Sequence, residues 1–314
     1  MKRIGIIKVS GLVLAAFALA VIPFLPATAE EDTAKPTAWI QISPVNERLN
    51  LGCEESHDGK FKVSNIGSEA FSFKVYANAY GVQDMTYDPI FGEEGAYSQL
   101  AKWISFGQGE YKDLGPGENI EVPYHIAIPA DCPSGGQYAV LFAETIPKGE
   151  VSSGMGIQTI SRVGMLVFVN LGGETRSTGE FIDFTQNWWT DEKVSSSTVV
   201  QNTGNVDFTV HQTYTVTSLF GAELYNNTSD KPVLPETTRE ITQKWEETPF
   251  MGLFNVTNKV SYLGQVPVDE TKLVLVAPIW LIVTFSTVFC LIIALIVVII
   301  VKSVRKSKQS KLTK

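Results

Sequence analysis

Cysteine has the most readily assigned chemistry of any residue type in this 314-residue sequence, which contains three. Cys290 lies within a long apolar segment, so Cys53 and Cys132 form the remaining pair that can oxidise in an exported domain. Turn-forming residues flank both cysteines, and the strand pattern described below places both in connections at one end of an immunoglobulin-like sandwich. The sequence therefore predicts a Cys53–Cys132 disulfide, with two unpaired thiols as the alternative.

Two adjacent tryptophans, Trp188 and Trp189, are the candidate binding residues. Consecutive residues of a regular strand point to opposite faces, so at least one of the two rings is expected to be exposed. Aromatic rings suit contacts with sugars or proteins, because they bring a large apolar area at a small cost in entropy. The alternative is a structural pair, with one ring in the core and the other over a sheet edge.

No pattern of catalytic residues is recognisable. His57, His125 and His211 are far apart in the sequence, and no HExxH, nucleophile-elbow, P-loop or Cys-x-x-Cys motif occurs. We therefore expect a protein that is not an enzyme and that needs no metal or cofactor; a catalytic triad assembled from distant loops is the alternative. An acidic stretch, residues 84–94, could offer carboxylates to Ca²⁺, but it lacks the spacing of a calcium loop and is better interpreted as a solvated loop.

The pentapeptide LPETT, residues 234–238, resembles the sorting signal Leu-Pro-x-Thr-Gly that sortases cleave before a terminal hydrophobic segment. Threonine replaces the glycine here, and 34 residues separate the motif from Leu273. We interpret it as a turn within a folded domain, so the protein should keep its membrane span and not become linked to the cell wall.

The N-terminus predicts export. Three basic residues precede an apolar run from Gly11 to Leu25, and the small-residue sequence Ala27-Thr28-Ala29 follows. This is the layout of a secretory signal peptide over residues 1–29, with an uncleaved N-terminal anchor as the alternative.

The C-terminus predicts a membrane anchor. Residues 273–301 carry no charge, and a helix over Ile279–Val301 would be roughly 35 Å long, enough to cross a hydrocarbon core of about 30 Å. The six basic and no acidic residues of 302–314 predict a cytoplasmic tail under the positive-inside rule. The expected topology is single-pass, with the N-terminus outside the cell membrane.

The charge distribution argues against nucleic acid as a partner. Nine of the 25 basic residues lie in the predicted signal peptide and tail, whereas all 33 acidic residues lie between Glu30 and Glu270. The exported part is therefore strongly acidic, and such a surface repels nucleic acid and anionic wall polymers.

The exported part has the period-2 pattern of half-buried strands. Apolar residues alternate with polar ones in residues 71–79, 120–128 and 208–216, and clusters of Gly, Pro and Asn separate the strands. The only helix-like stretch is residues 97–104. The predicted fold class is all-β: two tandem immunoglobulin-like antiparallel β-sandwiches plus one C-terminal transmembrane helix.

An internal repeat sets the predicted domains. VSNIGSEAF from Val63 and VQNTGNVDF from Val200 share Val-x-Asn-x-Gly-x-x-x-Phe, a phrase that we interpret as a hairpin whose Asn and Gly tolerate positive φ. Two further pairs of segments follow in the same order: LGPGENIEV after the first copy matches VLPETTREI after the second, and GGQYAV matches MGLFNV. The predicted sandwiches are residues 38–172 and 175–268.

Four segments of the first half resemble the first domain of the WxL-interacting proteins: ISPVNERLNL, GKFKVSNIGSEAFSFKV, WISF and LGPGENIEVPYHIAIPADCPSGGQYAV. These are surface proteins of Gram-positive bacteria, and their first domain is described as peptidoglycan-binding. The resemblance covers residues 40–145 in detail and implies two immunoglobulin-like domains, one membrane span and a short basic tail. The second domain departs from the family at Trp188–Trp189 and at Ser218. A looser similarity to pilus-chaperone sandwiches fits less well, because those chaperones are soluble.

Taken together, the sequence favours a membrane-anchored cell-surface protein that binds or scaffolds. By resemblance, its first domain would contact peptidoglycan or a partner surface protein, and no small-molecule substrate is expected. The alternative is an accessory or sensory subunit of a membrane protein complex, with the span as its interface; a wall hydrolase is a third hypothesis.

Overall fold

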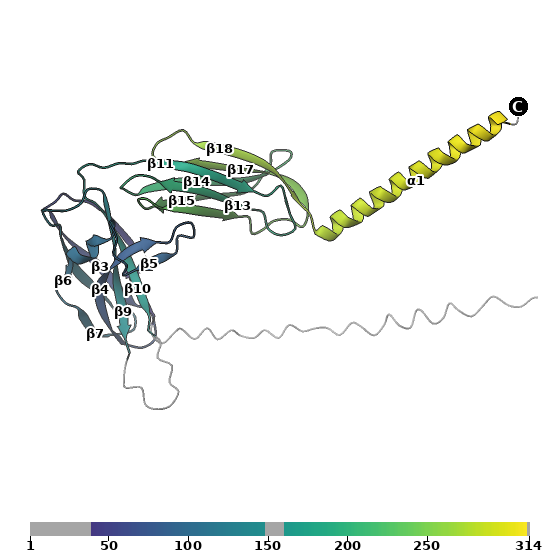
Figure 1. Cartoon of the computed structure of the whole chain (residues 1–314). Coiled ribbons are helices and arrows are strands. Elements are labelled where there is room, and N and C mark those ends of the chain that lie inside the picture. The colour runs from purple at the N-terminus through teal and green to yellow at the C-terminus, as the bar shows by residue number, and fades with distance from the viewer. Residues whose placement is uncertain (1–38, 148–159, 313–314) are drawn as a thin grey trace, which may run out of the picture. The chain divides into compact units, whose positions relative to one another are not determined.

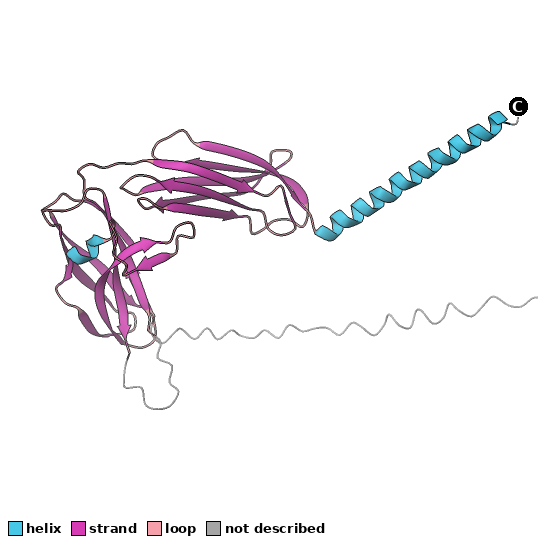
Figure 2. Cartoon of the chain, in the orientation of Figure 1, coloured by secondary structure: helices cyan, strands magenta, loops and turns pink. Residues whose placement is uncertain are grey.

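A computed structural model describes residues 39–147 and 160–312 of the chain (Figure 1). Among these residues, strands predominate and form two β-sandwiches followed by one long C-terminal helix (Figure 2). This agrees with the predicted fold class. The predicted signal peptide lies outside the described residues.

The first sandwich contains two sheets. One has the order β1-β3-β8-β6, formed by Ile40–Ser43, Ser56–Asn65, Asn119–Ala127 and Ile104–Phe106. The other has the order β2-β10-β9-β4-β5, formed by Asn46–Asn50, Arg162–Asn170, Gly136–Ile146, Phe71–Val82 and Pro89–Phe91, and β7 (Glu110–Leu114) also pairs with β4. A short 3₁₀ helix, Gln99–Trp103, lies where the helix-like stretch was predicted.

The core of the first sandwich follows the predicted alternation. Phe71, Phe73 and Val75 of β4 are buried, as are alternate residues of β8 from Val122 to Ile126. These side chains face the opposite sheet and form one continuous apolar cluster.

The second sandwich repeats this topology. One sheet has the order β11-β13-β16, formed by Gly179–Gln186, Ser195–Asn202 and Thr238–Lys244. The other has the order β12-β18-β17-β14-β15, formed by Trp189–Thr190, Val268–Val276, Gly252–Ser261, Phe208–Ser218 and Glu223–Val233. In both sandwiches the short second strand pairs in parallel with the last strand, β2 with β10 and β12 with β18.

A buried polar layer divides the core of the second sandwich into two apolar clusters. Gln212, which has the same parity as its apolar neighbours on β14, is fully buried. Its amide donates to Thr198 Oγ1 at 3.0 Å and to Asn258 Oδ1 at 2.8 Å, and its carbonyl oxygen accepts from Gln243 at 3.1 Å. These contacts satisfy polar groups that would otherwise be costly to bury.

The repeated phrase does not form a hairpin. Each copy connects two different sheets, β3 to β4 in the first sandwich and β13 to β14 in the second. Asn65 and Asn202 do not adopt a positive φ, nor do the glycines that follow them, Gly67 and Gly204. The prediction of a hairpin was therefore wrong, and so was the prediction that the asparagine serves to adopt a positive φ.

The side chains of these asparagines explain the repeat, because both are completely buried and make equivalent hydrogen bonds. Asn65 Nδ2 donates to the carbonyls of Glu69 and Leu114 at 2.9 Å, and its Oδ1 accepts from Gly67 N at 2.9 Å. Asn202 Nδ2 donates to the carbonyls of Val206 at 2.8 Å and Val233 at 2.9 Å, and its Oδ1 accepts from Gly204 N at 2.8 Å. Asn65 thus connects the β3–β4 corner to the end of β7 at Leu114, and Asn202 connects the β13–β14 corner to the end of β15 at Val233. Leu114 and Val233 begin the next pair of matching segments in the internal repeat.

Two residues separate the C-terminal helix α1, Ile279–Leu312, from the end of β18 at Val276. The charge-free segment predicted from residue 273 therefore combines two elements: its first residues complete β18, where Val274 and Val276 are buried. Ile279–Val301 is the one helix of the described residues that is long and apolar enough to cross a membrane, and none of it is buried against protein.

Candidate functional site

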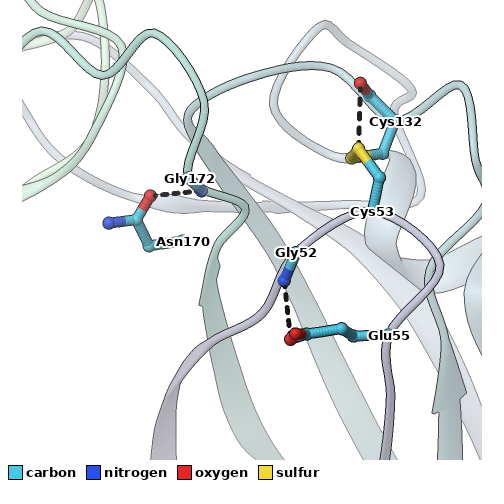
Figure 3. Close-up of a disulfide and its surroundings, with 6 residues drawn as sticks. All are labelled: Gly52, Cys53, Glu55, Cys132, Asn170 and Gly172. Atoms are coloured by element: carbon cyan, nitrogen blue, oxygen red, sulfur yellow. Dashed lines mark hydrogen bonds between the residues drawn. A yellow bond between two sulfur atoms is a disulfide. The ribbon is translucent and has the colours of Figure 1, made fainter.

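The predicted disulfide is present, between Cys53 and Cys132 (Figure 3). The Cα atoms lie 5.6 Å apart, and the bond joins the β2–β3 connection to the β8–β9 connection across 79 residues of sequence. Cys132 packs against the core of the first sandwich, and the nearby Glu55 carboxylate accepts a hydrogen bond from Gly52 N at 2.8 Å. The bond is structural, because it fixes two connections at the same end of one sandwich.

The two tryptophans have different environments. Trp188 is 73% exposed, whereas Trp189 is half-buried on the edge strand β12. The indole Nε1 of Trp189 donates to the carbonyl of Ala277 at 3.0 Å, next to the start of α1 at Ile279. Trp189 therefore has a structural role at this edge, while the binding role of Trp188 stays a prediction.

The acidic insertion, residues 84–94, keeps its four carboxylates exposed, as predicted, but its first part also contacts the LPETT turn of the second sandwich. Met85 N donates to the carbonyl of Thr238 at 2.8 Å, and Glu240 N donates to the carbonyl of Met85 at 3.1 Å. The carboxylate of Asp84 accepts from Thr238 N at 3.0 Å. No cluster of three His, Cys, Asp or Glu residues suited to a metal ion occurs within residues 39–147 and 160–312.

Two tyrosines, Tyr87 in the insertion and Tyr97 just after it, complete this contact. Tyr87 accepts a hydrogen bond from Leu234 N at 2.5 Å, and the guanidinium of Arg239 lies 4.0 Å from the centre of its ring. Tyr97 donates to the Glu236 carboxylate at 2.9 Å. The LPETT motif, predicted to be a turn inside the second domain, is such a turn between β15 and β16, and Leu234 is buried.

A cavity of about 250 Å³ opens beside this contact. Its lining is rich in tyrosine and includes both strand and turn residues: Tyr80, Gly81, Ile90, Tyr97, Tyr138 and Leu234. Glu93 and Glu94, both exposed, lie at the same cavity and supply its acidic groups. The described residues belong to one structural unit, which includes every residue of the lining.

The electrostatics of the cavity favour neutral hydroxyls. Burial raises the pKa of Tyr87 to about 12, and burial together with the Glu236 carboxylate raises the pKa of Tyr97 to about 12. Burial raises the pKa of Tyr138, whose hydroxyl donates to Asp207 at 3.1 Å. These tyrosines stay protonated at neutral pH. Of the three, Tyr97 and Tyr138 line the cavity, and they contribute ring faces rather than charge, because the hydroxyls of both already donate to carboxylates.

This arrangement is suited to binding and has no catalytic chemistry that we can assign. Aromatic faces with a few hydroxyls and carboxylates match ligands that present both apolar faces and hydrogen-bonding groups, such as sugar rings or peptides. The sequence did not reveal the cavity, because its lining comes from segments up to about 150 residues apart that share no periodic pattern. The one local signal was the tyrosine content of residues 76–97.

Comparisons with known proteins identify no family. No protein-family model matches the sequence, and no curated protein sequence does. Solved structures with a similar fold include fimbrial and pilus chaperones and a PapD-like domain of human CEP192, all at low identity. The class 5 fimbriae chaperone CfaA is 14% identical, with 74% of this chain and 99% of that chain covered and a TM-score of 0.38.

Two further examples are complexes. A chain of the CsuC–CsuE chaperone–tip subunit complex from Acinetobacter baumannii is 11% identical, covering 77% of this chain and 100% of that chain, with a TM-score of 0.38. A chain of the Salmonella enterica SafA pilin–SafB chaperone complex is 8% identical, covering 77% and 99%, with a TM-score of 0.39. Similarity at this level carries no argument about partners.

Proposed function

We propose that this chain is a single-pass membrane protein that displays its two sandwiches outside the cell and acts by binding rather than by catalysis. The observation that carries the proposal is the helix Ile279–Val301, which has no charged residue, is strongly apolar and is not buried against the rest of the protein. Exposed aliphatic side chains over this length are stable in lipid and not in water. The basic residues after Val301 support a cytoplasmic C-terminus.

The disulfide supports the same orientation. Disulfides persist in oxidising compartments and are rare in the cytosol, so the first sandwich belongs on the outer side of the membrane. An exported ectodomain with a cytoplasmic tail also accounts for the separation of acidic and basic residues along the sequence.

This topology gives a direct prediction. Protease added to intact protoplasts should digest both sandwiches and spare an epitope tag placed after Lys314, because the bilayer shields the tail. The same protease added after detergent lysis should remove the tag as well. Loss of the tag from intact protoplasts would contradict the proposed orientation.

The finer proposal concerns the ligand. By its resemblance to the WxL-interacting proteins, the first sandwich would contact peptidoglycan or a partner surface protein. The tyrosine-lined cavity is the site that we propose for this contact, because it combines tyrosine ring faces with exposed carboxylates. Detergent-solubilised full-length protein should therefore be retained on purified peptidoglycan if the wall is the ligand.

Gly81 offers a way to close the cavity without disturbing the backbone. It lines the cavity on β4, and a Cβ built on it meets no atom within 4 Å. We expect Gly81→Phe to lower retention on peptidoglycan by about tenfold, since the loss of about 1.4 kcal/mol of binding free energy is sufficient. Gly107→Phe is the matched control, because Gly107 also has open space around its Cβ and lies outside the cavity.

The outcomes separate the hypotheses. Equal retention of both variants and the parent would mean that the cavity is not the wall-binding site. No retention of the parent protein would exclude peptidoglycan as the ligand. Crosslinking in whole cells, followed by purification, would then distinguish a secreted surface protein from integral membrane partners, which the alternative function as a membrane-complex subunit requires.

A further inference from the structure

The end of the second sandwich that leads into the membrane helix carries a cluster of exposed apolar side chains. We name it the apolar end and define it by Trp188, Leu219, Phe220, Phe250 and Met251. Their side chains are exposed by 73%, 52%, 99%, 64% and 56%, respectively. Exposed aromatic residues gathered in this way mark an interaction surface more often than a single exposed residue does.

Strand register places these residues at one end. β18 ends at Val276, which lies opposite Gly252 at the start of β17, directly after Met251. Ser218 at the end of β14 lies opposite Phe254, so the following Leu219–Phe220 turn is at this end too. Trp188 joins them because its carbonyl accepts a hydrogen bond from Leu275 N at 2.8 Å.

The opposite end of the same strands differs. There the β17–β18 connection, between Ser261 and Val268, exposes a single large apolar residue, Val266. The residues that begin β14 and end β15 at that end, Phe208 and Val233, are buried. The asymmetry shows that the apolar end is not a general property of the turns of this sandwich.

The membrane helix starts next to the apolar end. Only Ala277 and Pro278 separate β18 from α1, a connection that spans about 7 Å when fully extended. Ala277 is itself fixed to β12, because its N donates to the carbonyl of Thr190 at 3.0 Å. The ring of Phe250 also lies 6.3 Å from the ring of Trp280, in the first turn of the helix.

We infer that the apolar end docks on the lipid bilayer that the helix spans, with Phe220, Phe250 and Trp188 inserted at the interface between headgroups and acyl chains. This inference rests on the proposed membrane span. Lipid is the expected occupant because the surface consists of separate turn tips rather than a groove. The short connection also keeps these turn tips close to the bilayer, so the effective concentration of lipid around them is high. Aromatic residues are favoured at that depth, where part of the ring contacts acyl chains and part contacts water.

Charge excludes an electrostatic mode of docking. The charged residues around the apolar end are mostly acidic: Asp191, Glu192, Lys193, Glu223, Glu246 and Glu247. Lys193 is already paired with Glu246. Docking should therefore occur on zwitterionic lipid and change little with salt, unlike the binding of basic segments to anionic membranes.

The test uses the full-length protein reconstituted into phosphatidylcholine vesicles, with one fluorescent thiol label per molecule. Cys290 in the parent chain reports on the span. In a Cys290→Ala background, Ala222→Cys reports on the apolar end and Gln265→Cys on the opposite end, and both positions are exposed. Lipids with a nitroxide near the start or near the end of the acyl chain quench labels at shallow or deep positions.

We expect deep quenching at residue 290, shallow quenching with a blue-shifted emission at residue 222, and neither at residue 265. Phe220→Ser together with Phe250→Ser should abolish the quenching and the blue shift at 222, whereas Val266→Ser should leave both unchanged. Raising the salt concentration should not release the label at 222 from the lipid.

A quenched label at 290 with an unquenched label at 222 would overturn the docking and leave the span intact. An unquenched label at 290 would overturn the span and the docking together. A label at 222 that iodide quenches in lipid vesicles, and that is shielded from iodide in isolated cell membranes, would show that a protein rather than lipid covers the apolar end.

Discussion

Replacing Asn202 by alanine should lower the free energy of unfolding of the second sandwich by about 3 kcal/mol, because three buried backbone groups lose a partner at about 1 kcal/mol or more each. Two of these groups are the carbonyls of Val206 and Val233, and the third is the N–H of Gly204. Water cannot replace the lost partner easily, since Asn202 is fully buried. Calorimetry of the full-length protein in detergent should resolve the change.

Matched variants make this test specific. Asn65→Ala should destabilise the first sandwich by a similar amount, because Asn65 makes the equivalent three hydrogen bonds. Asn226→Ala, at an exposed position on β15, should change stability by no more than about 0.5 kcal/mol. If Asn202→Ala is as mild as Asn226→Ala, the corner is not the stabilising element that we describe.

Removing the disulfide should have the largest effect on the first sandwich. The Cys53–Cys132 bond closes a loop with a sequence separation of 79, which corresponds to roughly 4–5 kcal/mol in the chain-entropy model. This is an upper figure, because residual structure in the unfolded chain lowers it. We expect the double variant Cys53→Ala, Cys132→Ala to lower the melting transition of the first sandwich and to leave that of the second in place.

Thiol counting provides the accompanying measurement. In a Cys290→Ala background, the unfolded and unreduced protein should have no reactive thiol, and reduction should expose two. Two reactive thiols before reduction would show that the bond does not form in the cell. The calorimetric prediction would fail if the double variant melted like the parent protein.

The sequence was sufficient to predict the strands and their inward faces, since the alternation at Phe71, Phe73 and Val75 is a local signal that burial follows directly. It predicted the disulfide because, of its three cysteines, only Cys53 and Cys132 lie outside the long apolar C-terminal segment. The charge-free segment begins at residue 273, six residues before α1 starts at Ile279, because the inward residues at the end of β18 are as uncharged as the helix that follows.

Other features were beyond local patterns. The asparagines of the repeated phrase were assigned to backbone conformation, whereas their side chains bond to residues on other strands, which no turn rule describes. The contact between residues 84–97 and the LPETT turn joins segments about 150 residues apart, so it depends on how the tertiary fold brings them together. The cavity beside it could not be predicted for the same reason.

The direct connection between β18 and α1 has a mechanical consequence for the proposed membrane topology. In that topology, tension between the membrane and the first sandwich enters the second sandwich at Val276 and leaves at Gly179, the start of β11. Gly179 lies opposite Asn202, at the end of the sandwich away from the helix, so the force runs along the strands. The β17–β18 ladder, from Val276 opposite Gly252 to Val268 opposite Val260, is then sheared as a whole. The hydrogen bonds of this ladder must then break together rather than one after another, so the second sandwich resists extension under load.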